Sequence, residues 1–195
     1  MSATLTPWQL AEPALESCRA TIEQSGSCHN LTSYMRAGTP LLTCLWRYAD
    51  DGDKAAPARL WGRLGLALEA DLLVAVTDTW QVEVPRETVG LVPRPSQHPD
   101  RFEALQVTAV TIMGTGWEWQ QRYSRGDGGP VSFGEVVEVP ALVGPVPTGL
   151  GDGLRGKPGK PRPHPRVVLQ HIAEVLGPVT AFPLHPDVKA VLEPS

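Results

Sequence analysis

Residues 71–85, DLLVAVTDTWQVEVP, are the stretch from which the fold can be worked out. The stretch begins as a continuous apolar run, which is typical of a strand buried on both faces. It then alternates, with Trp80, Val82 and Val84 separated by polar residues, as a strand with one exposed face does. We therefore expect a strand that is fully buried at its start and emerges toward an edge.

Three more strand-like segments follow: EALQVTAVTIM (103–113), WEWQQRYSR (117–125) and PVSFGEVVEVP (130–140). Short Gly-containing links at 114–116 and 126–129 join them, as in antiparallel hairpins. The pattern predicts a meander of at least three strands. The strand within 71–84 extends it.

The segments before residue 71 predict two helices and one more strand. Residues 7–24 carry apolar residues at helical spacing, with Thr6 as N-cap, Pro7 at the first position and Gly26 at the end. Residues 40–50 favour a buried strand that a turn at 50–53 closes. Residues 55–70 favour an amphipathic helix with Arg59 and Arg63 on its polar side, in which Gly62 and Gly65 allow close packing against a sheet. Residues 29–38 carry no clear signal for either a helix or a strand.

The composition changes after Pro140. Residues 141–166 are rich in Pro and Gly and show no hydrophobic period, so we expect an extended arm with polyproline character. Residues 167–177 predict a short amphipathic helix, and 178–195 a strand and one more helical turn. Five basic residues in the arm form the expected interaction surface: Arg155, Lys157, Lys160, Arg162 and Arg166.

These segments predict an α+β fold with an antiparallel sheet of about four to five strands on one or two helices. Residues 1–140 form the domain, 141–166 the arm or linker, and 167–195 a small C-terminal element. The net charge of −4 and the pI near 5.7 argue against a protein whose surface is basic overall, as that of many nucleic-acid-binding domains is. Three cysteines without CxxC spacing, and no apolar run of membrane length, favour a cytoplasmic protein without membrane contact or cofactor.

The tripeptide His-Pro-Asp occurs twice, at 98–100 and at 185–187. Proline restricts the residue before it to extended geometry, and Asp is a good helix cap. Asp100 with Glu103 fits a capping box, and Asp187 fits an N-cap. We interpret the repeat as a local way of starting a backbone element.

A second interpretation uses Pro99-Asp100, a strand-rich spacer and Glu118-Trp119-Gln120. This order resembles the PD-(D/E)XK nucleases. The resemblance implies that Asp100 and Glu118 hold a divalent metal ion, and that Gln120 stands where the family has the lysine that positions the attacking water. It makes a metal-dependent nuclease an alternative function.

By elimination we expect a non-catalytic protein-interaction or structural subunit of a larger assembly, of virion or mobile-element origin, that associates with itself or with other protein subunits. The arm and the loop 86–102 are the expected contact surfaces. Another alternative is sequence-independent binding of nucleic-acid phosphates by the basic arm. No aromatic residue interleaves its charges, so stacking on single strands is not indicated.

Overall fold

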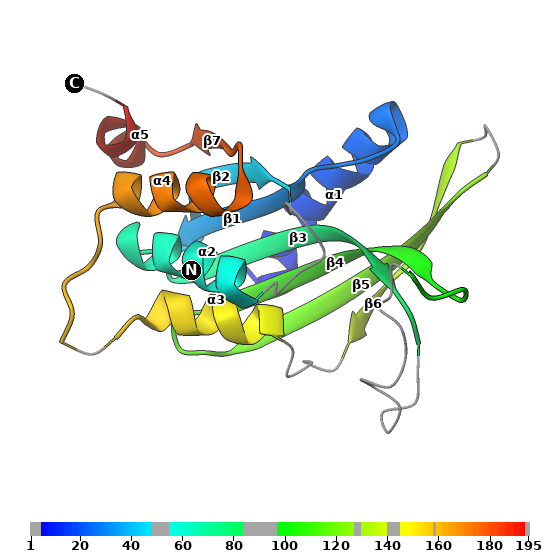
Figure 1. The fold of residues 1–195 in the computed structure, drawn as a ribbon, viewed down its shortest axis with the longest axis horizontal. Coiled ribbons are helices and arrows are strands. Elements are labelled where there is room, and N and C mark those ends of the chain that lie inside the picture. Colours follow the sequence, from blue (N-terminus) through cyan, green and yellow to red (C-terminus); the bar gives the residue numbers. More distant parts are fainter. Residues whose placement is uncertain are drawn as a thin grey trace.

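The computed structural model describes residues 5–47, 55–83, 97–126, 130–139, 145–157 and 159–193. These residues form one antiparallel sheet of seven strands in the order β6-β5-β4-β3-β1-β2-β7, with helices on both faces (Figure 1). The strands are β1 (Asn30–Arg36), β2 (Thr39–Trp46), β3 (Leu72–Gln81), β4 (Phe102–Thr111), β5 (Gly116–Arg125), β6 (Val131–Val139) and β7 (Thr180–Pro183). The helices are α1 (Pro7–Ser25), α2 (Ala55–Ala67), α3 (Pro145–Arg155), α4 (Pro165–Leu176) and α5 (Pro186–Leu192).

The α+β class, the antiparallel sheet and the β3–β6 meander are confirmed. The expected numbers of strands and helices were too small. The described residues form seven strands and five helices, whereas we expected four to five strands on one or two helices. The unassigned segment 29–38 forms β1, which pairs with β3 and so extends the sheet on the side away from β4. β3 is therefore the central strand. Its first five residues are buried and its last five are not, as its pattern predicted.

Helix α1 covers one face of the sheet. Thr6 accepts a hydrogen bond from the Gln9 N–H, and the Gln9 side chain accepts one from the Thr6 N–H, which completes a capping box. Gly26 ends the helix with φ of 75°, a backbone conformation that glycine adopts at little cost. Both ends agree with the prediction. Buried residues of α1 pack against side chains of β1, β3, β4 and β5: Ala11, Ala14, Leu15, Cys18 and Ile22.

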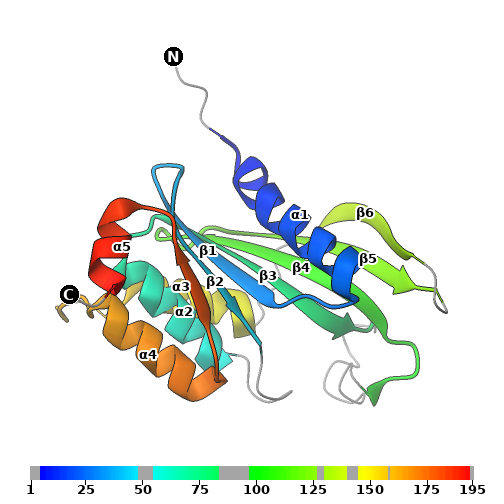
Figure 2. The same cartoon turned by 90° about the horizontal axis from the view of Figure 1, so that it is seen from above.

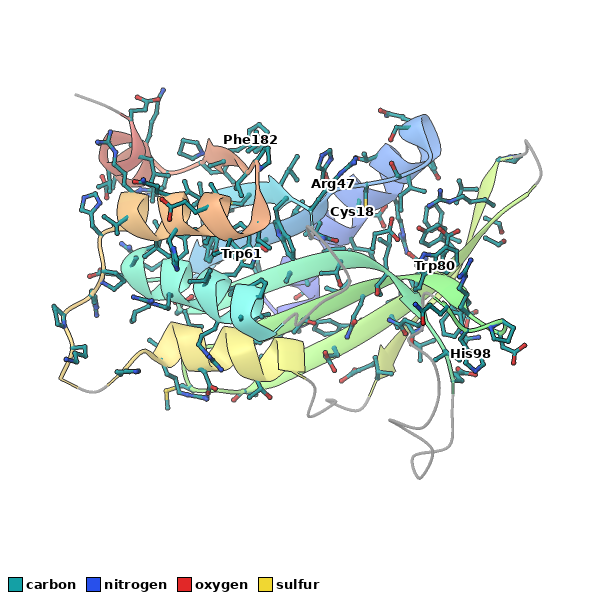
Figure 3. All side chains as sticks on the ribbon, viewed as in Figure 1. Cys18, Arg47, Trp61, Trp80, His98 and Phe182 are labelled. Atoms are coloured by element: carbon teal, nitrogen blue, oxygen red, sulfur yellow. The ribbon has the colours of Figure 1, made fainter. Side chains whose placement is uncertain are left out.

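Helices α2, α3 and α4 cover the opposite face, as the view in Figure 2 shows. Trp61 of α2 is 1% exposed and stacks against Trp46 of β2 with ring centroids 5.2 Å apart. Figure 3 shows Trp61 within this layer. The Tyr34 hydroxyl of β1 donates a 3.1 Å hydrogen bond to the Trp61 carbonyl. These contacts belong to the hydrophobic core between α2 and the sheet, and they join α2 directly to β1 and β2.

The expectation of an extended arm over 141–166 was wrong for residues 145–155, which form helix α3, and for residues 165–166, which begin helix α4. Each internal glycine costs a helix about 1 kcal/mol relative to alanine. Residues 145–155 contain three glycines, so their sequence did not predict a helix. Leu150 and Leu154 offset this cost, because they lie one turn apart and are 1% and 0% exposed. Residues 141–144 lie outside the described part of the chain, as do the predicted turn at 50–53 and most of the loop 86–102.

The C-terminal element contains the expected helix, strand and helical turn. β7 pairs with β2, and Val168, Ile172 and Val188 are buried in the core that α2 forms with the sheet. Residues 167–193 therefore share a core with the first 140 residues. No helix in the described ranges is long and apolar enough to cross a bilayer.

Both copies of His-Pro-Asp precede a backbone element, as expected. The side chain that accepts the backbone hydrogen bond is the histidine, however, and not the aspartate. His98 Nδ1 accepts a hydrogen bond from the Asp100 N–H at 3.1 Å, and His185 Nδ1 accepts one from the Asp187 N–H at 3.3 Å. His164 does the same for the Arg166 N–H. The predicted capping box of Asp100 with Glu103 was wrong, because a strand begins at Phe102. Asp187 is likewise not the N-cap of α5, since His185 occupies that position.

Candidate interaction site

A groove of about 860 Å³ lies between α2, the end of α3 and the segment that follows α3. This volume lies within the range of about 300–1,000 Å³ that is typical of small-molecule binding pockets. We call it the basic groove and the segment 156–164 the basic segment. The groove is lined by Arg59, Arg63, Leu66, Asp152, Gly153, Arg155, Gly156, Lys157, Lys160, Pro161, Arg162 and Pro163.

Two glycines bring the helices that form the groove into backbone contact. A Cβ atom on Gly62 would lie 2.1 Å from the Leu150 carbonyl oxygen, and one on Gly153 would lie 2.2 Å from the Arg59 carbonyl oxygen. Real Cβ atoms do not approach backbone so closely, so α2 and α3 cross at these glycines. The sequence predicted close packing of Gly62 against a sheet, but Gly62 packs against a helix. The crossing places the arginines of α2 beside the end of α3.

The basic segment turns back along α2 after α3 ends. Gly156 has φ of 68°, a left-handed conformation that favours glycine, and it lies against the side chain of Leu66. Farther along, Arg162 Nη1 forms a hydrogen-bonded ion pair with Oε1 of Glu69, just beyond α2. These two contacts hold the segment on the α2 side of the sheet.

The groove concentrates positive charge. Six of the chain's 17 basic residues line it, against one of the 21 acidic residues, so a chain of net charge −4 is more strongly negative elsewhere. The single acid, Asp152, is paired with Arg155 at 2.7 Å. Lys157 and Lys160 are exposed and form no ion pair within the described residues. The local field therefore favours an anionic partner.

Four of the five predicted interaction residues meet in this groove: Arg155, Lys157, Lys160 and Arg162. Arg166 does not line it; it lies in the first turn of α4 and its Nε donates a 3.1 Å hydrogen bond to the Leu192 carbonyl. Sequence reasoning missed the contribution of Arg59 and Arg63 to this site. Their spacing of four residues on the polar side of a helix was the available signal.

The residues of the nuclease alternative do not come together. Glu118 of β5 pairs with Thr108 of β4, which lies six residues after the start of β4 at Phe102, about 20 Å along the strand. Asp100 precedes that start by two residues. The Asp100 side chain is 87% exposed, and Figure 3 shows the neighbouring His98 at the Trp80 end of the sheet. Among the described residues, no group of three or more His, Cys, Asp or Glu side chains is arranged to hold a metal ion.

Glu118 is itself buried, at 2% exposure. Its Oε1 accepts hydrogen bonds from Gln106 Nε2 at 3.1 Å and from Thr108 Oγ1 at 3.3 Å. Gln120 lies on the same face, opposite Gln106. These polar side chains form a row on the α2–α3 side of the sheet.

A second polar cluster lies on the α1 face, where β3, β4 and β5 run side by side. The Tyr123 hydroxyl donates a 2.6 Å hydrogen bond to Asp78 Oδ1, and Arg125 forms a 2.9 Å ion pair with Glu103. Burial raises the pKa of Glu103, and Asp78 adds to this shift while Arg125 opposes it. The four side chains satisfy one another, which fits a structural role.

Comparisons with protein-family models, with curated proteins and with solved structures find no match for this chain.

Proposed function

We propose that this protein is a non-catalytic interaction subunit that binds acidic protein surfaces, including that of a second copy, through the basic groove. The observation that carries the proposal is the collection of six cationic side chains around one groove on a chain whose remaining charge is negative. Opposite charges on two surfaces accelerate their encounter and select partner and register. An acidic partner surface would therefore encounter this groove faster than a neutral one and would be selected by it.

The chemistry of the lining residues also supports binding. Arginine offers a planar fork of donors suited to carboxylates, and lysine offers a mobile point charge. The one acidic side chain of the groove, Asp152, is engaged by Arg155. The described lining residues thus combine many donors for an anion with no pair of groups arranged as nucleophile and base.

Sedimentation velocity of the full chain tests this function. At low salt and increasing concentration, the wild type is expected to sediment above its monomer mass of 21.0 kDa. The double variant Lys157→Glu/Lys160→Glu is expected to associate at least tenfold more weakly. Lys189→Glu is the matched control, because Lys189 is exposed on α5 outside the groove. A wild type that stays monomeric at all concentrations, or a double variant that associates like the control, contradicts the proposal.

The groove also supports a second candidate, sequence-independent binding of nucleic-acid phosphates. The specific observation is that its six cations are accompanied by no aromatic lining residue, so the backbone rather than the bases would be contacted. Binding of a labelled DNA duplex should then fall steeply with salt, and the double variant should lower the salt slope by about one per removed charge. DNA binding by a strictly monomeric wild type would favour this candidate over self-association.

A further inference from the structure

A second groove, of about 520 Å³, lies on the opposite face of the sheet, where α1 begins beside the start of β5 and the end of β6. We call it the aromatic groove. Its lining residues are Thr6, Pro7, Trp8, Trp117, Trp119, Val136 and Glu138.

The lining residues of the aromatic groove are positioned by the first turn of α1 and by the paired strands β5 and β6. The capping box at Thr6 fixes the first turn of α1 and with it Trp8, whose ring centroid lies 5.2 Å from that of Trp119. Trp117 and Trp119 are two residues apart on β5 and share one face of the sheet. Glu138 of β6 lies directly opposite Trp119 and is exposed. Trp119 is buried, whereas Trp8 and Trp117 are only half-buried, so two indoles border the opening.

This combination of groups indicates the chemistry of a ligand. Tryptophan-lined grooves bind extended proline-rich chains, which lose little conformational entropy on binding. Indole faces also attract Lys and Arg cations. Glu138 adds a carboxylate, and no basic residue is among the lining residues. An extended segment that carries both prolines and cations fits this groove.

The chain contains such a segment. Residues 155–165 read RGKPGKPRPHP, in which prolines alternate with basic residues. The described residues 160–164 form neither helix nor strand, and Lys160, Pro161 and Arg162 are exposed. Because α3 and α4 hold both ends, ordering the segment against a partner costs less than ordering a free tail.

We propose that the aromatic groove of one copy binds the basic segment of a second copy. This inference rests on the proposed self-association and names its receptor surface. Within one copy the Arg162–Glu69 pair and the Gly156–Leu66 contact keep the segment beside α2, whereas the groove is lined by the start of α1. Figure 2 shows α1 and α2 on opposite faces of the sheet. The contact is therefore head-to-tail between copies. Such contacts build closed rings or open filaments rather than simple two-fold dimers.

A mixing experiment with two complementary variants tests the contact. Glu138→Lys alters the aromatic groove at an exposed position, and Lys157→Glu/Lys160→Glu alters the basic segment. Each alone is expected to lose at least tenfold in self-association by sedimentation velocity. Trp117→Ala provides a second groove variant. When Trp117→Ala, whose altered groove gains no charge that attracts the acidic segment, is mixed with Lys157→Glu/Lys160→Glu, one intact groove can meet one intact segment, so dimers and nothing larger should form. Glu135→Lys is the matched control, because Glu135 is exposed on β6 and does not line the groove.

A direct probe is a synthetic peptide of residues 155–165. It should quench or shift tryptophan fluorescence of the wild type, and do so at least tenfold more weakly with Glu138→Lys. If the groove variants associate like wild type while the segment variant does not, the aromatic groove is not the receptor, but the proposed function stands. Mixed variants that stay monomeric also overturn the inference. A wild type that never associates overturns both proposals.

Discussion

Gly62 of α2 and Gly153 of α3 touch backbone to backbone: a Cβ atom on either residue would lie 2.8 Å from the Cα atom of the other. This contact brings together two helices that are far apart in the sequence. It also sets the width of the basic groove, since Arg59 and Arg63 flank Gly62 on α2 and Arg155 follows Gly153 on α3.

Gly153→Ala should therefore destabilise the protein. Alanine raises helix propensity by about 1 kcal/mol, but the new Cβ would meet the Arg59 carbonyl oxygen at 2.2 Å and force the helices apart. We expect a net loss of about 1–3 kcal/mol in the free energy of unfolding, measured by urea denaturation. Gly151→Ala is the matched control in the same helix. Its Cβ would find only ordinary contacts from 3.6 Å outward, so it should be neutral or stabilising. Equal effects of the two substitutions would contradict the close crossing.

Leu154→Ala tests whether residues 145–155 pack as a helix. Leu154 is fully buried, so removing its side chain should lower the free energy of unfolding by about 2–5 kcal/mol in thermal or urea unfolding. Val167→Ala, at a 63% exposed position on α4, should change it by less than about 0.5 kcal/mol. An extended, solvated arm would instead make the two substitutions equivalent.

Glu103 should make stability depend on pH in a defined direction. Its folded-state pKa is raised, mainly by burial, so the folded chain takes up this proton more readily than the unfolded chain. Its contribution to stability should therefore increase as the pH falls from above the folded-state pKa toward the unfolded value of about 4.3. The free energy of unfolding of the wild type relative to Glu103→Gln, measured by urea denaturation at several pH values, should rise in that range. A fall would mean that Arg125 outweighs burial.

His185 is the N-cap of α5, and its Nδ1 acts as the hydrogen-bond acceptor. His185→Ala removes the acceptor and should cost about 1 kcal/mol in the free energy of unfolding, with faster amide exchange over residues 187–192. His185→Asn keeps an acceptor on a short side chain and should retain most of the stability. Alanine and asparagine variants with the same exchange rates would show that the imidazole does not cap this helix.

Much of the backbone could be predicted from local patterns. The apolar run that opens 71–85 and the Gly-containing link at 114–116 are local signals of a buried strand and a hairpin, and they match β3 and the β4–β5 connection. The Thr6–Gln9 capping box and Gly26 likewise mark both ends of α1. Segment 29–38 carried no such signal. It became β1 because it pairs with β3 on one side and β2 on the other.

The candidate sites depended on tertiary structure to a much greater degree. The cluster of basic residues after position 155 was visible in the sequence, but its combination with Arg59 and Arg63 required α2 and α3 to meet. The aromatic groove likewise joins Trp8 to Trp117 across more than a hundred residues. Spacing along the chain predicts such proximity only within one element.

The amino-acid sequence by itself therefore determined the sheet-forming periodicity, the helix caps and the basic character of residues 155–166. Tertiary structure alone decided that a glycine-rich stretch becomes a helix, that Glu118 is buried, and that two grooves lie on opposite faces of the sheet. The physical reason is that caps and periodicity act between neighbouring residues, whereas α3 is stable only once Leu150 and Leu154 are buried and its backbone lies against α2.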